Sequence, residues 1–363
     1  MTRPARTALI SLAVALYCAV LFLGFDVAYS RLVVGDERQF RIPSEEYHHG
    51  LLANYSGYDL WGGRRYRLFT NSLGMKDAAV REVSAGAASH RILLIGDSFT
   101  EGLGLPFEDT FAGMLYRAGQ ERSRRVRFLN AGVSSNSPVI YYKKVKYLLD
   151  RGVHLDEVVV FSDPSDIQDE ATAYFCIDDD PQYRRYCDPK SPLPGWAKQR
   201  SFLETYLIMT NTTGMNLKKA FTPRPPKSSD LDVARIGWLL PGADVQPTYA
   251  PLGVDGGIAR SLQNMRRLAE LLKARNIPLT IVVYPWISQL RDNDRDSRQA
   301  ALWREFCKDH CQGFINLFPA FFRAKEADPK WQEHMFIPGD IHLSEAGNRL
   351  VYGELAESLF REH

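Results

Sequence analysis

The sequence predicts an α/β fold in which helices cover both faces of a central parallel sheet, a three-layer α/β/α sandwich. Short apolar runs alternate along the chain with amphipathic helical patterns, which is typical of a parallel sheet with two buried faces. The chain has 363 residues, of which 45% are hydrophobic and 24% are charged. This length and composition allow one large domain, or one domain plus an insertion.

The elements follow one another in a regular order. The strand-like runs are short and apolar, and they occupy residues 91–95, 126–131, 157–162, 279–284 and 314–317. Helical patterns lie near residues 110–120, 139–149, 258–274, 298–310 and 344–361. In the helix at 258–274, an apolar stripe marks the side that faces the core: Leu262, Met265, Leu268, Leu271 and Leu272.

The end of the first strand carries the most informative residues. Its apolar run stops at Gly96-Asp97-Ser98, which places a serine hydroxyl just past a buried strand. In an open parallel sheet this edge is where ligands bind, because loops and helix N-termini meet there. Ser98 is therefore a candidate nucleophile, provided that a base reaches it.

A suitable base lies near the C-terminus. Asp340 and His342 come just ahead of the last helical pattern. A serine nucleophile needs an imidazole to take its proton, and the imidazole needs a carboxylate to fix its tautomer. Position 100 is Thr, where the Gly-x-Ser-x-Gly elbow would have glycine, and this disfavours an ordinary α/β-hydrolase.

On these residues the sequence resembles the SGNH (GDSL-type) hydrolase superfamily, in four blocks. Ser98 in Gly96-Asp97-Ser98 matches the family nucleophile, and Gly132 in the second block, residues 130–134, matches the glycine that lends an N–H to the oxyanion hole. The third block ends Ser165-Asp166, and the fourth holds Asp340 and His342. The resemblance covers roughly residues 88–166 and 256–363, and it implies a flavodoxin-like sheet.

Two positions depart from the family pattern. Ser165 stands where the family asparagine donates to the oxyanion, and losing one such donor typically lowers the rate about 10²–10³-fold. A serine hydroxyl can donate, but it is shorter than an asparagine amide. Asp340 precedes His342 by two residues where the commonest spacing is three, yet extended residues two apart face the same side.

The resemblance implies a serine esterase or acyltransferase that needs no metal or organic cofactor. His342, oriented by Asp340, would take the proton of Ser98. The N–H groups of Ser98 and Gly132 and the side chain of Ser165 would bind the oxyanion. Further candidates for substrate binding are Asp97, Asp166 and Trp286.

The resemblance also implies the substrates, which would be O-acyl groups, above all O-acetyl groups, of an exported or cell-surface glycan. Membrane-associated polysaccharide machinery is an expected partner. The alternative is a protein of this fold with little or no activity, which binds glycan or assists polysaccharide assembly.

The N-terminus predicts a membrane anchor. Residues 8–25 form an apolar run without charges, close to the length that spans a bilayer. Arg3 and Arg6 precede the run, so the first residues would be cytoplasmic and the rest outside. We therefore expect a single pass through a bacterial inner membrane and a periplasmic catalytic domain. The bacterial, Gram-negative part of this expectation rests on the resemblance. A cleaved signal peptide is the alternative, although no clear small-x-small site follows Phe25.

The net charge and the motifs exclude some classes of ligand, and the cysteines allow disulfides. The formal net charge of +2 gives no electrostatic footprint for nucleic acid, and neither a phosphate loop nor a zinc-type Cys/His spacing is present. Local pairing would give the disulfides Cys176–Cys187 and Cys307–Cys311, one of three connectivities. Free buried cysteines, or a metal site that includes His310, are the alternatives. Cys18 has no lipobox before it and reads as a small hydrophobe.

The predicted organisation has three parts: a cytoplasmic tip and anchor at 1–30, an extension rich in aromatics and turns at 31–87, and the catalytic domain at 88–363. The last part carries an insertion at about 170–255, with a helical stretch at 196–210 and a proline-rich linker at 223–226. Insertions at this edge of a sheet tend to build substrate walls or lids. In the extension, His48 and His49 have no evident third ligand, which favours a packing or surface role.

Overall fold

The computed structural model describes residues 3–29, 40–61, 64–86, 89–122, 126–177, 235–239 and 246–360. The chain divides into two compact units. One unit contains the N-terminal helix, and the other contains the sheet with its covering helices.

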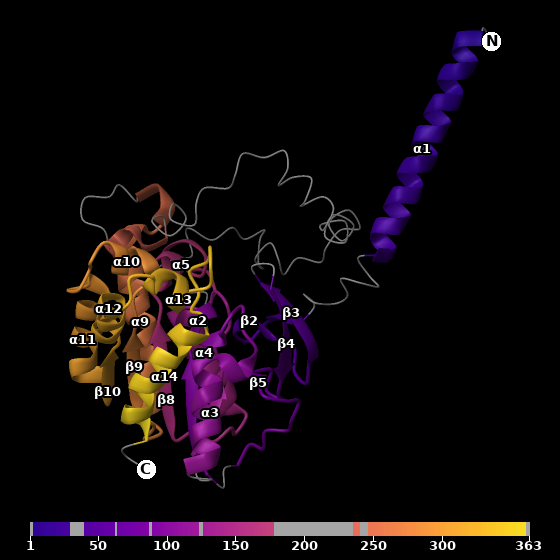
Figure 1. Cartoon of the computed structure of the whole chain (residues 1–363). Coiled ribbons are helices and arrows are strands. Elements are labelled where there is room, and N and C mark those ends of the chain that lie inside the picture. The colour runs from indigo at the N-terminus through magenta and orange to yellow at the C-terminus, as the bar shows by residue number, and fades with distance from the viewer. Residues whose placement is uncertain are drawn as a thin grey trace. The chain divides into compact units, whose positions relative to one another are not determined.

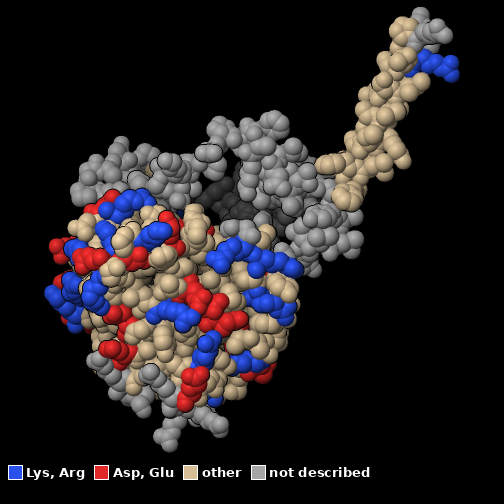
Figure 2. Space-filling view, in the orientation of Figure 1, with Lys and Arg blue, Asp and Glu red and all other residues tan. Residues whose placement is uncertain are grey.

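Helix α1, Arg3–Tyr29, is the apolar N-terminal helix that the sequence predicts. Its segment Pro4–Phe25 has 22 residues and a hydropathy of 2.5, which is long and apolar enough to cross a membrane. Among its described side chains, Figure 2 shows positive charge only near one end. A helix of this kind is either a membrane span or a signal sequence.

A mixed sheet of eight strands organises the second unit (Figure 1), in the order β10-β9-β8-β6-β7-β5-β4-β3. Its five parallel strands are β6 (His90–Ile95), β7 (Val126–Asn130), β8 (Glu157–Ser162), β9 (Leu279–Val283) and β10 (Gly313–Asn316). Each predicted strand is present and agrees to within one residue at either end. Strands β8 and β9 are almost wholly buried, which explains their continuous apolar sequence.

The strand order determines where the helices lie. β7 lies on one side of β6, whereas β8, β9 and β10 lie on the other. Because parallel crossovers are right-handed, the helix after β6 covers one face and the helices after β7, β8 and β9 cover the opposite face. Accordingly α3 (Phe111–Arg122) packs with α14 (Glu345–Leu359), while α4 (Pro138–Asp150), α5 (Asp166–Thr172) and α9 (Gly253–Lys273) pack together. The three-layer, flavodoxin-like architecture is therefore confirmed.

The remaining helices are α2 (Ser98–Glu101), α10 (Ile287–Arg291), α11 (Arg298–His310), α12 (Phe318–Ala327) and α13 (Trp331–Met335). Short 3₁₀ turns occupy Phe107–Asp109, Gly237–Leu239 and Gln246–Tyr249. The helix predicted at 196–210 and the linker predicted at 223–226 lie outside the described residues. The described part of the insertion includes Trp238, which is buried and donates its Nε1–H to the carbonyl of Pro164 at 2.8 Å.

Residues 40–86 add antiparallel strands that the prediction of a parallel sheet did not include. β3 (Ser56–Trp61), β4 (Arg64–Thr70) and β5 (Lys76–Asp77) continue the main sheet, with β5 paired to β7. A separate hairpin joins β1 (Arg41–Ser44) to β2 (His48–Leu51). β4 alternates exposed arginines with buried Tyr66 and Leu68, so its period of two was readable in the sequence.

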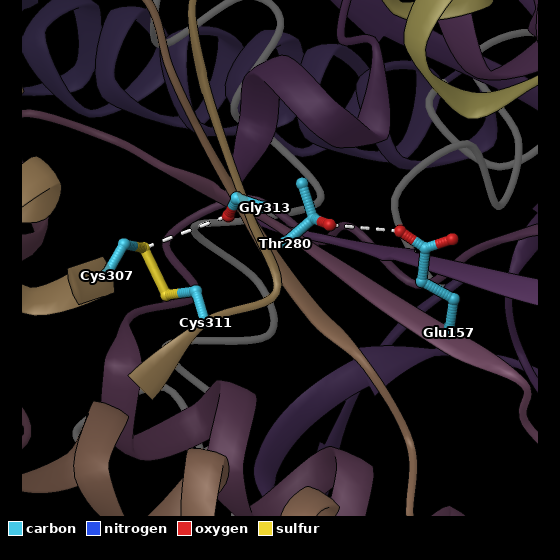
Figure 3. The surroundings of a disulfide bond; sticks show 5 residues. All are labelled: Glu157, Thr280, Cys307, Cys311 and Gly313. Atoms are coloured by element: carbon cyan, nitrogen blue, oxygen red, sulfur yellow. Dashed lines mark hydrogen bonds between the residues drawn. A yellow bond between two sulfur atoms is a disulfide. The ribbon is translucent and has the colours of Figure 1, made fainter. Parts of the chain in front are cut away.

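A disulfide between Cys307 and Cys311 joins the last turn of α11 to the segment that leads into β10 (Figure 3). This pair confirms one of the two predicted disulfides. Cys187, in the other predicted pair, lies outside the described residues. In the described part of the chain, no three His, Cys, Asp or Glu side chains are grouped so that they could hold a metal ion.

Candidate active site

Ser98 begins α2, directly beyond the end of β6. Close packing makes glycine necessary just before it, because a Cβ at Gly96 would lie 2.2 Å from Thr100 Oγ1 and 2.9 Å from the carbonyl oxygen of Phe161. Asp97 caps the short helix by accepting the Phe99 N–H at 2.9 Å. The tight turn therefore holds the serine at the edge of the sheet between β6 and β8, where the strand order reverses and ligands bind in open α/β sheets.

Asp340 and His342 lie in the loop between α13 and α14. A bridge between Phe336 and Leu343 closes this loop, and the Ile337 N–H donates to the His342 carbonyl at 2.8 Å. Gly339, just before Asp340, turns the chain at φ 76°, a backbone conformation that glycine adopts without strain. The side chains of Asp340 and His342, which are separated by one residue, thereby lie on the same side of the loop.

The structure brings these two side chains to Ser98. His342 Nε2 lies 2.9 Å from Ser98 Oγ, and His342 Nδ1 lies 2.5 Å from Asp340 Oδ1. Because the carboxylate accepts the hydrogen bond of Nδ1–H, the proton stays on Nδ1 and Nε2 is left to accept the proton of the serine hydroxyl. The arrangement is that of a nucleophile, a base and an orienting acid.

Asp340 stays ionised across the neutral range. Burial acts to raise its pKa, but hydrogen bonds from His342 and Trp61, together with the charge of His342, lower the pKa to about 2. Ser98 and His342 are 8% and 5% exposed, so their contact is shielded from bulk water. A charged acid beside a shielded imidazole is suited to stabilise the positive charge that forms when the base takes a proton.

Trp61 was not among the predicted site residues. Its Nε1–H donates to Asp340 Oδ2 at 2.7 Å, and its ring meets the His342 ring edge-on with centroids 5.3 Å apart. The residue ends β3, which belongs to the extension, 279 positions before Asp340. No spacing or motif connects positions so far apart, so the sequence carried no signal for this contact.

A buried group of acids lies beside the nucleophile. Asp163 Oδ2 accepts the Tyr284 hydroxyl and the Trp286 Nε1–H, both at 2.8 Å. Burial, with Asp163 nearby, raises the pKa of Asp97 well above its usual value, and the same causes raise the pKa of Asp166. Asp97 and Asp166 are therefore protonated more readily than exposed carboxyls are.

The three residues predicted to touch substrate are buried in this structure. Asp97, Asp166 and Trp286 are 4%, 1% and 1% exposed. Asp166 accepts the Tyr141 hydroxyl and the Asp163 N–H, and Asp97 accepts the Phe99 N–H. These hydrogen bonds run inside the domain, and Asp97 Oδ2 also accepts the Ser98 hydroxyl at 3.1 Å. Contact of the three residues with substrate stays a prediction.

Two of the three predicted oxyanion donors have other partners. The Gly132 N–H donates to Asn130 Oδ1 at 3.0 Å, and the Ser165 hydroxyl donates to Asp163 Oδ1 at 2.6 Å. Gly132 packs so closely on α2, the helix that begins at Ser98, that a Cβ would lie 2.6 Å from the Glu101 nitrogen. The role of all three groups at an oxyanion stays a prediction.

Arg235 is a second residue that sequence reasoning did not single out. Its Nη2 donates to Ser165 Oγ and to Asp169 Oδ2, each at 3.2 Å. Burial acts to lower the pKa of Arg235, but the carboxyls of Asp169, Asp163 and Asp97 outweigh burial and raise it. The guanidinium thus brings positive charge to an edge of the sheet that is otherwise acidic.

A pocket of about 790 Å³ lies next to the segments that follow Ser98 and His342, but neither of these two residues lines it. Residues 104–106, which follow α2, and residues 344–346, which follow His342, both line it. Its charged lining is mixed in sign, with Arg64, Arg67 and Arg349 beside Glu108 and Glu345. Such a lining can donate to and accept from hydroxyl groups.

Comparison with known proteins finds similarity to solved esterase structures. An acetyl xylan esterase, AlAXEase, is 14% identical, with a TM-score of 0.44, and the match covers 74% of this chain and 100% of that one. A member of the lipolytic protein G-D-S-L family from Veillonella parvula is 13% identical, with a TM-score of 0.42 and coverages of 75% and 100%. A catalytic mutant of an acetylxylan esterase from Geobacillus stearothermophilus is 10% identical, with a TM-score of 0.42 and coverages of 76% and 97%. No protein-family model matches the chain, and no curated protein matches its sequence.

Proposed function

We propose that this protein is a serine esterase or acyltransferase of the SGNH type. The observation that carries the proposal is the chain of hydrogen bonds from Ser98 through His342 to Asp340, with the serine placed at the ligand-binding edge of the sheet. A serine, an imidazole and a carboxylate in this order form the usual device for acyl transfer. The motifs that resemble the superfamily lie at these same residues.

In the proposed mechanism Ser98 Oγ attacks the ester carbonyl while His342 Nε2 takes its proton. Asp340 stabilises the imidazolium, and the tetrahedral intermediate collapses when His342 returns the proton to the departing alcohol. Water then resolves the acyl-serine in a hydrolase, and a sugar hydroxyl resolves it in a transferase.

The oxyanion of the intermediate is proposed to bind the N–H groups of Ser98 and Gly132, with Ser165 as a third donor. Gly132 and Ser165 must first exchange their present partners, Asn130 and Asp163. This exchange opposes catalysis, since oxyanion donors act best when they are already free and aimed.

We propose O-acyl groups of an exported or cell-surface glycan as the substrate class. The resemblance of the motifs supports this class, and so does the pocket of mixed charge beside the loops of the site, because sugar hydroxyls need both donors and acceptors. Helix α1 supports a location at a membrane, and the arginines before its apolar run favour the catalytic unit on the outer side. That this membrane is a bacterial inner membrane, with polysaccharide machinery as a partner, is proposed from the resemblance of the motifs.

The second candidate function is glycan binding with little or no turnover. The observation that favours it is the engagement of both Gly132 and Ser165 by other groups. The two functions differ in whether Ser98 reacts.

The test is the intact mass of the full chain, purified in detergent, after brief exposure to a fluorophosphonate probe. Attack by Ser98 Oγ on phosphorus expels fluoride and leaves one phosphonyl adduct. We expect one adduct on the wild type and none on Ser98→Ala, together with turnover of p-nitrophenyl acetate that the variant lacks. A folded wild type that forms no adduct would contradict the enzyme and favour the binding protein.

A further inference from the structure

The carboxylate of Asp340 is held at both of its oxygens. Oδ1 accepts the His342 Nδ1–H at 2.5 Å and the His342 backbone N–H at 3.0 Å, while Oδ2 accepts the Trp61 Nε1–H at 2.7 Å. A carboxylate with a donor on only one oxygen can rotate about its Cβ–Cγ bond. The indole N–H opposes that rotation and keeps Oδ1 directed at the imidazole.

We infer that Trp61 is a positioning residue of the proposed triad, supplied by the N-terminal extension. The inference rests on the proposed function, because it assigns Trp61 to the acid that the mechanism uses. Trp61 touches neither Ser98 nor the ester. It acts through Asp340, by holding the carboxylate where it can stabilise the imidazolium as the proton moves.

The indole itself is fixed by its surroundings. Trp61 pairs with Arg64 at the end of the β3–β4 hairpin, and this hairpin continues through β5 into β7 of the main sheet. Gly104 passes close by, since a Cβ there would lie 3.5 Å from the indole Cδ1. The Nε1–H is thus presented from a strand, which positions a side chain more precisely than a free loop does.

A second contact ties the same extension to the nucleophile. Arg41, in β1, donates from Nη1 and Nη2 to the two oxygens of Glu101 at 2.9 and 2.6 Å. Glu101 is the last residue of α2, the helix that begins at Ser98, and it is fully buried. The extension therefore holds both parts of the site, the nucleophile through Arg41 and the acid through Trp61.

The test is a double-mutant cycle on the full chain in detergent, with p-nitrophenyl acetate as substrate. Trp61→Phe keeps an aromatic ring and removes the N–H. We expect kcat to fall about tenfold or more, as for a lost hydrogen bond to a charged group, with KM within about twofold. In an Asp340→Ala background, Trp61→Phe should cost nothing further, because the residue acts through that carboxylate.

The matched control is Trp331→Phe, since Trp331 is half-buried, meets the Phe336 ring edge-on and has no hydrogen bond to the three site residues among the described contacts. It should leave kcat unchanged. Wild-type kcat in Trp61→Phe would overturn the inference, and so would an equal loss in the Asp340→Ala background. If the wild type turns over no faster than Ser98→Ala, it is the proposed function that fails.

A second measurement needs no variant at position 61. With ¹⁵N-labelled tryptophan in the full chain, the buried and hydrogen-bonded indole N–H groups among the six tryptophans should exchange slowly with solvent. Asp340→Ala should speed the exchange of one of them, that of Trp61, and shift its resonance. If no indole resonance responds to Asp340→Ala, the hydrogen bond is absent and the inference is overturned.

Discussion

The edge of the parallel sheet and the N-terminal extension contribute to one site in different ways. The edge supplies Ser98 from a short motif that follows a buried strand, and this motif can be read in the sequence. The extension supplies Trp61 and Arg41 from polar hairpins without any motif, and each reaches its partner only in the folded chain. The groups that would react can be found from local sequence, whereas the groups that hold them in place depend on long-range packing.

The sharpest way to break this comparison is to remove the proposed base. His342→Ala should lower kcat for p-nitrophenyl acetate about 10⁴-fold or more, as removal of a triad histidine does. The matched control is His334→Ala, because His334 forms a similar pair with Asp328 at 2.6 Å on the surface. Steady-state kinetics of the two variants measure the effect. Equal activity in both would show that His342 is not the base and that the residues at the edge of the sheet do not form the catalytic site.

The extension can be tested through the stability of the second unit. Arg41→Met leaves the buried Glu101 carboxylate without its cation, and burial would then act to raise its pKa. We expect the free energy of unfolding to fall by about 3 kcal/mol, the lower end for a broken buried pair, because Arg41 is about one-third exposed. Chemical denaturation measures the change.

The control for Arg41 is Arg323→Met, which breaks an exposed pair with Glu354. Such a pair contributes at most about 1 kcal/mol. A loss in Arg41→Met no larger than in this control would show that the extension does not hold α2.

Acid stability should report on the contact between the two regions. The folded-state pKa of Asp340, about 2, lies below the usual 3.8, so this group stabilises the fold above the usual value and loses that contribution as the pH falls through 2. After allowance for screening of a partly exposed group, we expect about 1 kcal/mol. Urea titrations at pH 5 and pH 2 should show a smaller difference for Asp340→Asn than for the wild type, and an equal difference would contradict the assigned shift.

The smallest effect is expected at Ser165. The family pattern would make this position an oxyanion donor, and its loss would then cost about 10²–10³-fold in kcat. Because the hydroxyl must give up Asp163 to reach the oxyanion, its net contribution as a third donor should be small, and we expect Ser165→Ala to retain kcat within about threefold of the wild type. A loss of a hundredfold would show that the hydroxyl reaches the oxyanion at little cost.

Most of the second unit was predictable because its strands and helices carry strong local patterns. The valines of β8 mark a strand buried on both faces, and the apolar stripe of α9 marks a helix with one buried face. The antiparallel strands of the extension were missed because β3 and β4 mix polar with apolar residues, which is a weaker signal than the continuous apolar runs of the parallel strands. Ser98, Asp340 and His342 could be named from motifs, but not their hydrogen bonds.

The rest could not be read for a physical reason. The hydroxyl of Ser165 could donate either to the oxyanion or to a nearby carboxylate. Only the position of Asp163 in the fold shows that it donates to that carboxylate. Arg235 and Trp61 have no special neighbours in the sequence, and their roles come from segments that are distant along the chain. The position of Trp286 just after the strand at 279–284 does predict that it lies at the same edge as Ser98. Its burial, which this position does not report, turns its N–H inward to Asp163.

The distances along the chain between the site residues have a consequence for biosynthesis. Trp61 and Asp340 are 279 positions apart, and Ser98 and His342 are 244 apart. A nascent chain cannot form these contacts until its last segment has emerged and the sheet has closed, and contacts of such separation form slowly. Reactivity at Ser98 would therefore appear only in the finished protein, after synthesis and after any transport of the unfolded chain.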